Sequence, residues 1–175
     1  EGKLNKAQSH YLTKVMRTPI GGNFSLFNKL GEWQTIIKKI SKNDLTFKVT
    51  KQLRHKENET DLWLAFSPIR SNFFNFMIQK ATELGVSQFF PCITQNTNQT
   101  KINMRNLYMN IVEAAEQSER LTLPYLDQTI KLENLLENFP NDRCMILCNE
   151  TQDQLPNIQN AILQKINQYK KWAIF

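Results

Sequence analysis

Short apolar runs alternate with helical patterns through residues 62–175, and this alternation constrains the fold more than any other feature of the sequence. Strands are predicted at 62–66, 86–93, 144–148 and 172–175. Helices are predicted between them at 73–84, 104–120 and 158–171, with Gly85 placed to end the first. Such a chain folds as a parallel sheet with helices on both faces, and ligands bind at the carboxyl ends of its strands.

The first third of the chain has a different pattern. A short helix is predicted at 7–17, and residues 21–53 alternate apolar and polar side chains between turn signals, which indicates a small antiparallel β-module. A segment rich in charge, 54–61, separates the two patterns. We therefore predict two domains, 1–61 and 62–175.

The positive charge is confined to the first of these domains. Residues 1–61 hold 12 Lys and Arg against 6 Asp and Glu, whereas residues 62–175 hold 10 of each, which accounts for the net charge of +6. A basic module joined to a neutral one is typical of a polyanion-binding part that serves a second activity. A lysine-rich coding preference explains the composition equally well, so charge alone leaves both interpretations open.

The cysteines and the hydropathy exclude several classes of protein. The three cysteines are an odd number without CxxC spacing, and the chain has only 2 histidines, which argues against a disulfide framework and a zinc site. We expect buried, reduced thiols and no metal. Because no signal sequence and no bilayer-spanning apolar run is present, we expect a soluble, cytoplasmic protein.

Two stretches of the second domain resemble motifs of a known family. Residues 76–86 with Pro91 resemble a "QKATELGV…P" segment, and residues 113–120 with Pro124 are similar to an "EAAEQSxR…P" segment. A looser match from His10 to Trp33 resembles a "HLxxVLR…G…LF…GEW" pattern. These are motifs of the RsmE-type rRNA methyltransferases of the SPOUT superfamily, and the resemblance runs from about residue 7 to residue 175.

The resemblance implies both a fold and an activity. The fold would be α/β, with an N-terminal PUA-like β-barrel that binds RNA followed by a SPOUT (α/β knot) methyltransferase domain. The activity would be S-adenosylmethionine-dependent methylation of N3 of a uridine in 16S (small-subunit) rRNA, by a homodimer whose active sites lie near the dimer interface. The family's glycine-rich "GPEGG" loop, which holds the cofactor in the C-terminal knot, is absent from residues 1–175. We therefore expect these residues alone not to bind S-adenosylmethionine.

The helix at 104–120 carries the candidate catalytic residues. Its polar face is formed by Glu113, Glu116, Gln117 and Arg120. Its apolar face is formed by Leu107, Ile111, Ala114 and Ala115. The pattern alone favours a solvated face with a Glu116–Arg120 ion pair. The resemblance instead makes Glu116, Gln117 and Arg120 the catalytic candidates, because Gln pairs with a base edge and Arg binds phosphate.

Cofactor and RNA contacts are predicted elsewhere. The wall of the cofactor cleft is expected at the ends of the last two strands, formed by Leu147, Cys148, Asn149, Glu150, Ile174 and Phe175. The residues expected to bind the RNA backbone are basic: His10, Lys14, Arg17, Lys38, Arg54 and Lys80. For the individual lysines a scattered solvated surface is the alternative. The aromatics at 73, 74 and 76 are expected in the core rather than as a base-stacking platform.

Two functions of other classes remain open. One is an RNA-binding protein without catalysis, which the absent glycine-rich loop favours. The other is a small α/β enzyme that binds a nucleotide, although the sequence has no glycine-rich phosphate loop.

Overall fold

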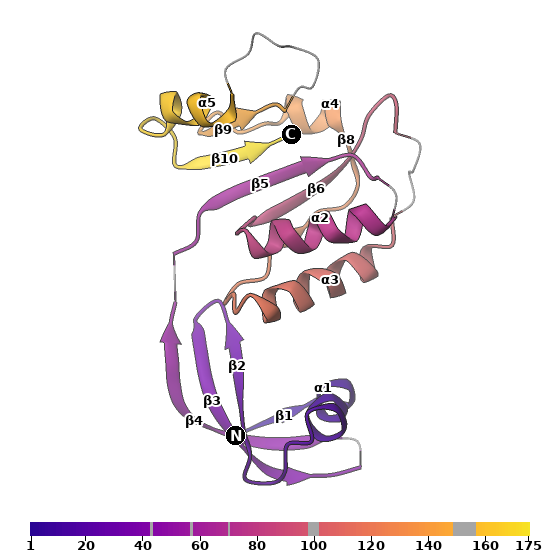
Figure 1. Cartoon of the computed structure of the whole chain (residues 1–175), viewed down its shortest axis with the longest axis vertical. Coiled ribbons are helices and arrows are strands. Elements are labelled where there is room, and N and C mark those ends of the chain that lie inside the picture. Colours follow the sequence, from indigo (N-terminus) through magenta and orange to yellow (C-terminus); the bar gives the residue numbers. More distant parts are fainter. Residues whose placement is uncertain (43, 57, 70, 98–101, 149–156) are drawn as a thin grey trace. The chain divides into compact units, whose positions relative to one another are not determined.

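The computed structural model describes residues 1–42, 44–56, 58–69, 71–97, 102–148 and 157–175. It divides into two compact units, Glu1–Glu57 and Asn58–Phe175 (Figure 1). The division falls within the charge-rich segment that separates the two sequence patterns.

The first unit is a curled antiparallel sheet with a short helical segment against it (Figure 1). Its elements are β1 (Gly2–Leu4), α1 (Lys6–His10), η1 (Tyr11–Val15), β2 (Asn23–Asn28), β3 (Gly31–Ile40) and β4 (Leu45–His55). The strand order is β1-β4-β3-β2, and every neighbouring pair is antiparallel. The predicted β-module is confirmed, and β1 is a strand that the sequence pattern did not predict. Register shifts between β3 and β4 bend the sheet.

The helical segment begins and ends earlier than the predicted 7–17. The side chain of Asn5 accepts a hydrogen bond from the Gln8 amide at 2.9 Å and caps α1, so the helix begins at Lys6. After His10 the segment continues as the π-helical turn η1, with the Met16 amide donating to the Tyr11 carbonyl at 3.0 Å. The segment stops before Arg17, whose φ of 54° lies in the left-handed region.

The second unit is built on a parallel sheet of six strands. Its elements are β5 (Asp61–Phe66), α2 (Ser71–Glu83), β6 (Gln88–Ile93), α3 (Met104–Gln117), β7 (Tyr125–Leu126), β8 (Ile130–Lys131), α4 (Leu132–Glu137), β9 (Arg143–Ile146), α5 (Ile158–Lys165) and β10 (Lys171–Ile174). The order is β7-β6-β5-β10-β9, with β8 paired to β6, and all the pairings are parallel. Strand β10 thus lies inside the sheet, between β5 and β9.

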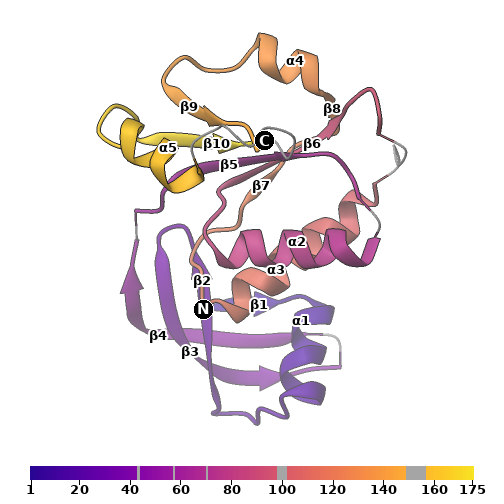
Figure 2. The same cartoon turned by 45° about the horizontal axis from the view of Figure 1, so that its top comes forward.

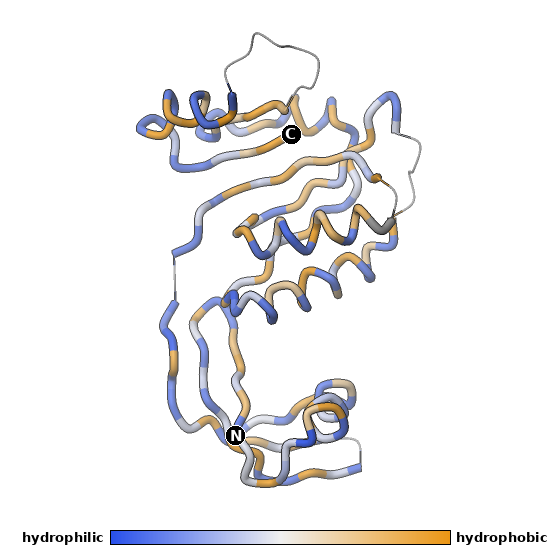
Figure 3. Tube along the Cα trace, viewed as in Figure 1, coloured by the Kyte–Doolittle hydropathy of each residue, from blue (hydrophilic) through white to orange (hydrophobic). Residues whose placement is uncertain are grey.

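Helices cover both faces of this sheet, as predicted. Leu62 and Leu64 of β5 face a core formed with α2 and α3, centred on Ile78 and Ile111. The alternate residues of β5 face a second core that includes Leu135 of α4. Figures 1 and 2 show α2 and α3 together on one side of the sheet and α4 on the other. In Figure 3 apolar residues follow β5 and β6, whereas β4 of the first unit is largely polar.

Helix α2 ends as its sequence predicts. Gly85 has a φ of 97°, its amide donates to the Thr82 carbonyl at 3.1 Å, and the Val86 amide donates to the Ala81 carbonyl at 3.0 Å. This pair of hydrogen bonds is a Schellman motif, which needs a residue that tolerates positive φ. The chain is thereby turned from the helix toward β6.

Several other elements differ in their bounds from the predicted ranges. Helix α3 stops at Gln117 rather than 120, because Glu119 has a φ of 55°. Helix α5 stops at Lys165 rather than 171, because the chain must turn before Lys171 pairs with both β5 and β9. Strand β9 is Arg143–Ile146 rather than 144–148. The apolar face of α3 is as predicted, with Leu107, Ile111, Ala114 and Ala115 buried.

Burial differs from expectation at two types of residue. Cys92 is buried as expected, but Cys144 is half-buried and Cys148 is exposed. Phe74 is in the core, whereas Phe73 and Phe76 are 68% and 61% exposed, so the prediction of core burial is wrong for both. The exposure of Phe73 and Phe76 follows from helix geometry, because only one face of α2 reaches the sheet.

None of the helices in the described ranges has the length and apolar character needed to span a membrane.

Candidate functional site

A small cavity lies at the carboxyl ends of the central strands of the second unit. Its volume is about 140 Å³, and it is lined by Ala65, Phe66, Ser67, Cys92, Thr94, Leu132, Leu147 and Phe175. Strands β5, β6 and β10 all end here, which is where open parallel sheets bind their ligands. None of these lining side chains is charged, so the cavity suits an uncharged or cationic ligand better than a phosphate.

Hydroxyl groups form the polar side of this cavity. The Thr94 and Thr97 hydroxyls lie 3.0 Å apart, and the Thr97 hydroxyl also accepts from the Thr94 amide at 2.8 Å. The Ser67 hydroxyl lies 3.5 Å from each of the two. Hydroxyls can both donate and accept, so this group can bind the polar edge of a ligand ring or its ribose. The sequence analysis did not identify them, because isolated Ser and Thr after a strand carry no distinctive spacing.

Cys92 contributes a neutral thiol to the cavity. Burial raises the pKa of Cys92 to about 11, so the thiolate is not populated near neutral pH. Its side chain is in the core, and the thiol lies 3.3 Å from the Phe90 carbonyl. The residue therefore shapes the cavity rather than acting as a nucleophile.

The predicted cofactor-binding residues fall into three groups. Leu147 and Phe175 line the cavity, and Leu147 is 69% exposed. Cys148 and Ile174 adjoin it, with the Cys148 amide donating to the Phe175 carbonyl at 2.9 Å. Asn149 and Glu150 lie outside the described residues.

Glu116 and Gln117 are exposed near the end of α3, as predicted for a polar face. Partial desolvation of its carboxyl group, and in second place the nearby Glu113 carboxylate, raise the pKa of Glu116 above the ordinary value for glutamate. A carboxylate with a raised pKa is a stronger base, which suits a residue that accepts a proton.

Arg120 does not continue the polar face of α3. Its guanidinium turns back to donate to the Thr82 carbonyl at 2.7 Å and the Val86 carbonyl at 2.9 Å, both at the end of α2. It also forms an ion pair with Glu59, and its side chain is only 9% exposed. The expected Glu116–Arg120 pair is therefore replaced by an Arg120–Glu59 pair, and the guanidinium links the segment after α3 to the end of α2.

The candidate catalytic residues and the cavity lie at opposite edges of the sheet. Helix α3 runs antiparallel to the strands, since it connects β6 to the parallel strand β7. Its last turn is thus at the amino ends of the strands, while the cavity is at their carboxyl ends. Strand β6 has 6 residues, which separates the two edges by roughly 20 Å at about 3.3 Å per residue. Glu116 and Gln117 of one chain do not reach the cavity of the same chain.

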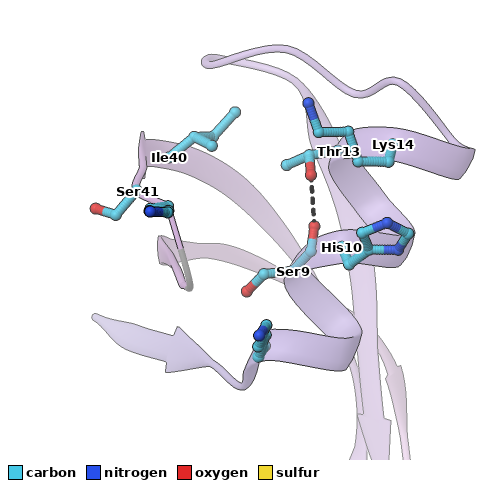
Figure 4. A pocket seen from close by; sticks show the side chains of 8 residues that line it. Ser9, His10, Thr13, Lys14, Ile40 and Ser41 are labelled. Atoms are coloured by element: carbon cyan, nitrogen blue, oxygen red, sulfur yellow. Dashed lines mark hydrogen bonds between the residues drawn. The ribbon is translucent and has the colours of Figure 1, made fainter.

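A second, larger cavity occupies the first unit and is basic. Its volume is about 330 Å³, and it is lined by Lys6, Ser9, His10, Thr13, Lys14, Ile40, Ser41 and Lys42 (Figure 4). The structure thus brings together two predicted RNA-binding residues, His10 and Lys14. Lys6 and Lys42 were not predicted, although Lys6 follows a helical spacing of four residues to His10 that could have identified it.

The other predicted RNA-binding residues do not line this cavity. Arg17 and Lys38 are exposed, which leaves them available to a ligand. Arg54 pairs with Glu32 at 2.7 Å, and this hydrogen bond, chiefly, lowers the pKa of Glu32. Lys80 pairs with Glu83 at 2.7 Å and lies 5.9 Å from the centre of the Phe76 ring. Within the described ranges no group of His, Cys, Asp and Glu is arranged to hold a metal ion.

Fold and cavities together define a two-part α/β protein, with an uncharged cavity on a parallel sheet and a basic cavity on a separate antiparallel unit. The chain belongs to the RNA methyltransferase domain family, whose profile matches residues 56–174. Residues 4–50 match a second profile, described as the RNA methyltransferase PUA domain. The resemblance seen in the sequence motifs is thereby confirmed.

Individual relatives agree with this assignment. A ribosomal RNA small subunit methyltransferase E of Rickettsia conorii is 31% identical over 156 residues, which cover 89% of this chain and 62% of that protein. One of Synechocystis is 28% identical, and the match covers 94% of this chain and 54% of that protein. The chain thus spans between 54% and 62% of the length of these two relatives.

A solved structure has the same fold. It is a ribosomal RNA small subunit methyltransferase E from Neisseria gonorrhoeae bound to S-adenosyl methionine, with a TM-score of 0.80 at 17% identity over 99% of this chain and 72% of that one. At this identity the likeness shows the fold alone.

Proposed function

We propose that the protein carrying this chain transfers a methyl group from S-adenosylmethionine to N3 of a uridine in small-subunit (16S) rRNA. The uncharged cavity at the carboxyl ends of β5, β6 and β10 is the observation that carries the proposal. S-adenosylmethionine has no phosphate and carries a positive sulfonium, so a cavity without cations suits it. A nucleotide-binding enzyme would need phosphate-binding groups at this edge, which makes that rival less favoured.

The residues at the cavity fit the parts of this cofactor. Phe66, Leu147 and Phe175 offer apolar surface for an adenine ring, and the Ser67 and Thr94 hydroxyls can bind ring nitrogens or ribose. When bound, the cofactor would supply an activated methyl group. The cavity, at about 140 Å³, is smaller than a complete small-molecule site, which begins at about 300 Å³. The chain's own contribution would therefore be to hold part of the cofactor, its adenine ring, and to exclude water from this edge.

N3 of uridine carries a proton and is paired or stacked in folded RNA. An enzyme must therefore present the base unstacked, help to remove the proton and align N3 with the methyl group. Glu116 is our candidate for accepting the proton because its pKa is raised, and Gln117 for pairing with the base edge. Arg120, which forms ion-pair and backbone contacts, would position the end of α3 rather than bind phosphate.

A homodimer would reconcile these roles with the roughly 20 Å between α3 and the cavity of one chain. The end of α3 in one copy would meet the cavity of a second copy, so that each active site lies at the dimer interface. The first unit, Glu1–Glu57, would bind the rRNA backbone. Modification of ribosomal RNA would place the protein in the cytoplasm.

Methyl transfer tests the proposal directly. The protein expressed from its complete gene is incubated with labelled S-adenosylmethionine and unmodified small-subunit rRNA, and the nucleosides are separated by mass spectrometry. We expect one N3-methyluridine, with incorporation greatly reduced in Gln117→Ala. RNA binding without any incorporation would instead support the non-catalytic RNA-binding function.

A further inference from the structure

Four cationic or ionisable side chains meet in the cavity of the first unit without a carboxylate among them. Lys6, His10 and Lys14 come from the helical segment, and Lys42 comes from the connection between β3 and β4. Within the described part of the chain none of the four forms an ion pair with Asp or Glu. Figure 4 shows the two walls, with Ile40 and Ser41 facing the side that carries Ser9, Thr13 and Lys14. Lysines that are grouped in a concavity and left unpaired form a site for an anion.

The backbone explains why these side chains share one side of the helix. Residues four apart lie close together on a helix, and the π-helical turn η1 adds a residue to the turn that carries Lys14. Opposite, Ile40 packs against the core of the unit, which fixes the other wall. The nearby acid Asp44 already forms an ion pair with Lys3, at 2.9 Å.

The hydroxyl groups of the cavity are partly used within the unit. The Thr13 hydroxyl donates to the Ser9 carbonyl at 2.8 Å, and the Ser9 hydroxyl donates to the Leu4 carbonyl at 3.3 Å. The N–H groups of Lys6, Lys14 and Lys42 therefore remain as the principal donors. A volume of about 330 Å³ falls at the lower end of small-molecule sites, which begin at about 300 Å³, and exceeds the need of a lone phosphate.

We propose that this cavity binds one nucleotide of the RNA, with its phosphate among Lys6, Lys14 and Lys42 and its sugar or base against the Ile40 wall. The inference rests on the proposed RNA binding by the first unit, and it adds a defined pocket with two lysines outside the sequence motifs. The bound nucleotide would fix the position of the RNA on the unit, because phosphate contacts set register without reading sequence.

Charge reversal inside and outside the cavity separates a pocket from a diffuse basic surface. Lys14→Glu and Lys42→Glu change the cavity, and Lys29→Glu makes the same charge change at an exposed residue of the same unit that does not line it. Affinity of the 175-residue chain for a fluorescently labelled single-stranded fragment of small-subunit rRNA is measured by anisotropy over a range of salt concentrations. Melting temperatures check that each variant is folded, and Lys14→Arg tests whether the charge alone suffices.

We expect each cavity variant to bind at least about tenfold more weakly, the effect of losing one charge-assisted hydrogen bond. The slope of log affinity against log salt should fall by about 0.7 for each lost phosphate contact on a single strand. Lys29→Glu should lose much less, and Lys14→Arg should bind nearly as the parent chain does. Equal losses in cavity and control variants would overturn the pocket while leaving RNA binding intact. No binding by the parent chain would overturn both this inference and the RNA-binding part of the proposed function.

Two further results keep the inference and the proposed function distinct. Selective loss in the cavity variants together with no methyl transfer would uphold the pocket and refute the enzyme. Uridine 5′-monophosphate is the competitor that tests the source of the phosphate. We expect it not to displace the RNA when its concentration equals that of the labelled fragment. Displacement at that concentration would assign the cavity to a free nucleotide instead.

Discussion

The two edges of the parallel sheet differ in how they use charge. At the amino ends of the strands, Arg143 contacts Asp61 at 2.7 Å and Arg120 contacts Glu59, and both guanidinium groups also bind backbone carbonyls. At the carboxyl ends the cavity is lined by no charged side chain. Charges that are paired and bound to backbone carbonyls stabilise a fold, whereas an uncharged concavity lined by hydroxyls is available to a ligand. The comparison teaches that charged residues alone are a poor guide to the cofactor site that we propose for this unit.

The largest effect is expected at the most buried charge of the amino edge. The Arg143 side chain is 3% exposed, and its guanidinium carbon lies 3.6 Å from the centre of the Trp63 ring. Arg143→Ala should lower the free energy of unfolding by about 3 kcal/mol, because it strips partners from buried acceptors and leaves a void. Urea unfolding measures this. The matched control is Lys171→Ala, whose exposed pair with Asp142 should contribute far less to the free energy of unfolding. Equal effects would remove the distinction between saturated and exposed charge.

Arg120 and Gln117 belong to the same polar sequence pattern but should differ in how much each contributes to stability. Arg120→Ala should cost about 2 kcal/mol, since its hydrogen bonds to the Thr82 and Val86 carbonyls hold the end of α2. Gln117→Ala should cost less than about 0.5 kcal/mol because the residue is exposed. Thermal unfolding of the two variants side by side measures the difference. A large loss for Gln117→Ala would show that the end of α3 is structural throughout.

The helical pattern of the sequence predicted the polar and apolar faces of α3 correctly, but only as far as the helix extends. Periodicity identified Leu107 and Ile111 as buried and Glu116 as exposed, because a regular helix repeats its faces. It placed Arg120 on the same face, since nothing in the letters shows that Glu119 adopts a positive φ and turns the chain. The side-chain contacts that then hold Arg120 come from residues distant in the sequence.

The sequence predicted where the cavity of the second unit lies, but it predicted only some of the residues that line it. Alternating strands and helices imply a site at the strand ends, and Leu147 and Phe175 do line the cavity. The hydroxyls of Ser67 and Thr94 were missed because they meet only when β5 and β6 pair. Likewise Lys42 joins Lys14 only through the curled sheet of the first unit, a long-range contact that no local pattern encodes.

Cys92 is expected to make the free energy of unfolding depend on pH in the alkaline range. Its folded-state pKa of about 11 lies above the ordinary value of 9.0, so the thiol ionises more readily in the unfolded chain. The associated stability is fully present below pH about 9 and is lost as the pH rises toward about 11, with a loss of about 1.4 kcal/mol at pH about 10. Urea unfolding across this range checks it against Cys92→Ala, which should lack this part of the pH dependence. An unchanged dependence in the variant would assign the effect to other groups.

The smallest effect on stability is expected at the open rim of the cavity. Leu147 is 69% exposed, so Leu147→Trp should change the free energy of unfolding by less than about 0.5 kcal/mol. The larger ring would occupy the cavity and should abolish binding of S-adenosylmethionine by the protein from the complete gene. Calorimetric titration measures this binding, and Leu163→Trp on the exposed surface of α5 is the control. Undiminished binding by Leu147→Trp would place the cofactor elsewhere.

Hydrogen exchange measured by mass spectrometry, with and without S-adenosylmethionine, tests most directly whether the uncharged edge binds the cofactor. The protein from the complete gene is compared in the two states, peptide by peptide. We predict slower exchange in the segments that end at the cavity, around 65–67, 92–97 and 146–148. Exchange at the amino edge of the same chain should change only where a second copy brings the end of α3 to the cavity. Protection confined to residues 58–62 and 82–86, with none at the carboxyl edge, would contradict the account.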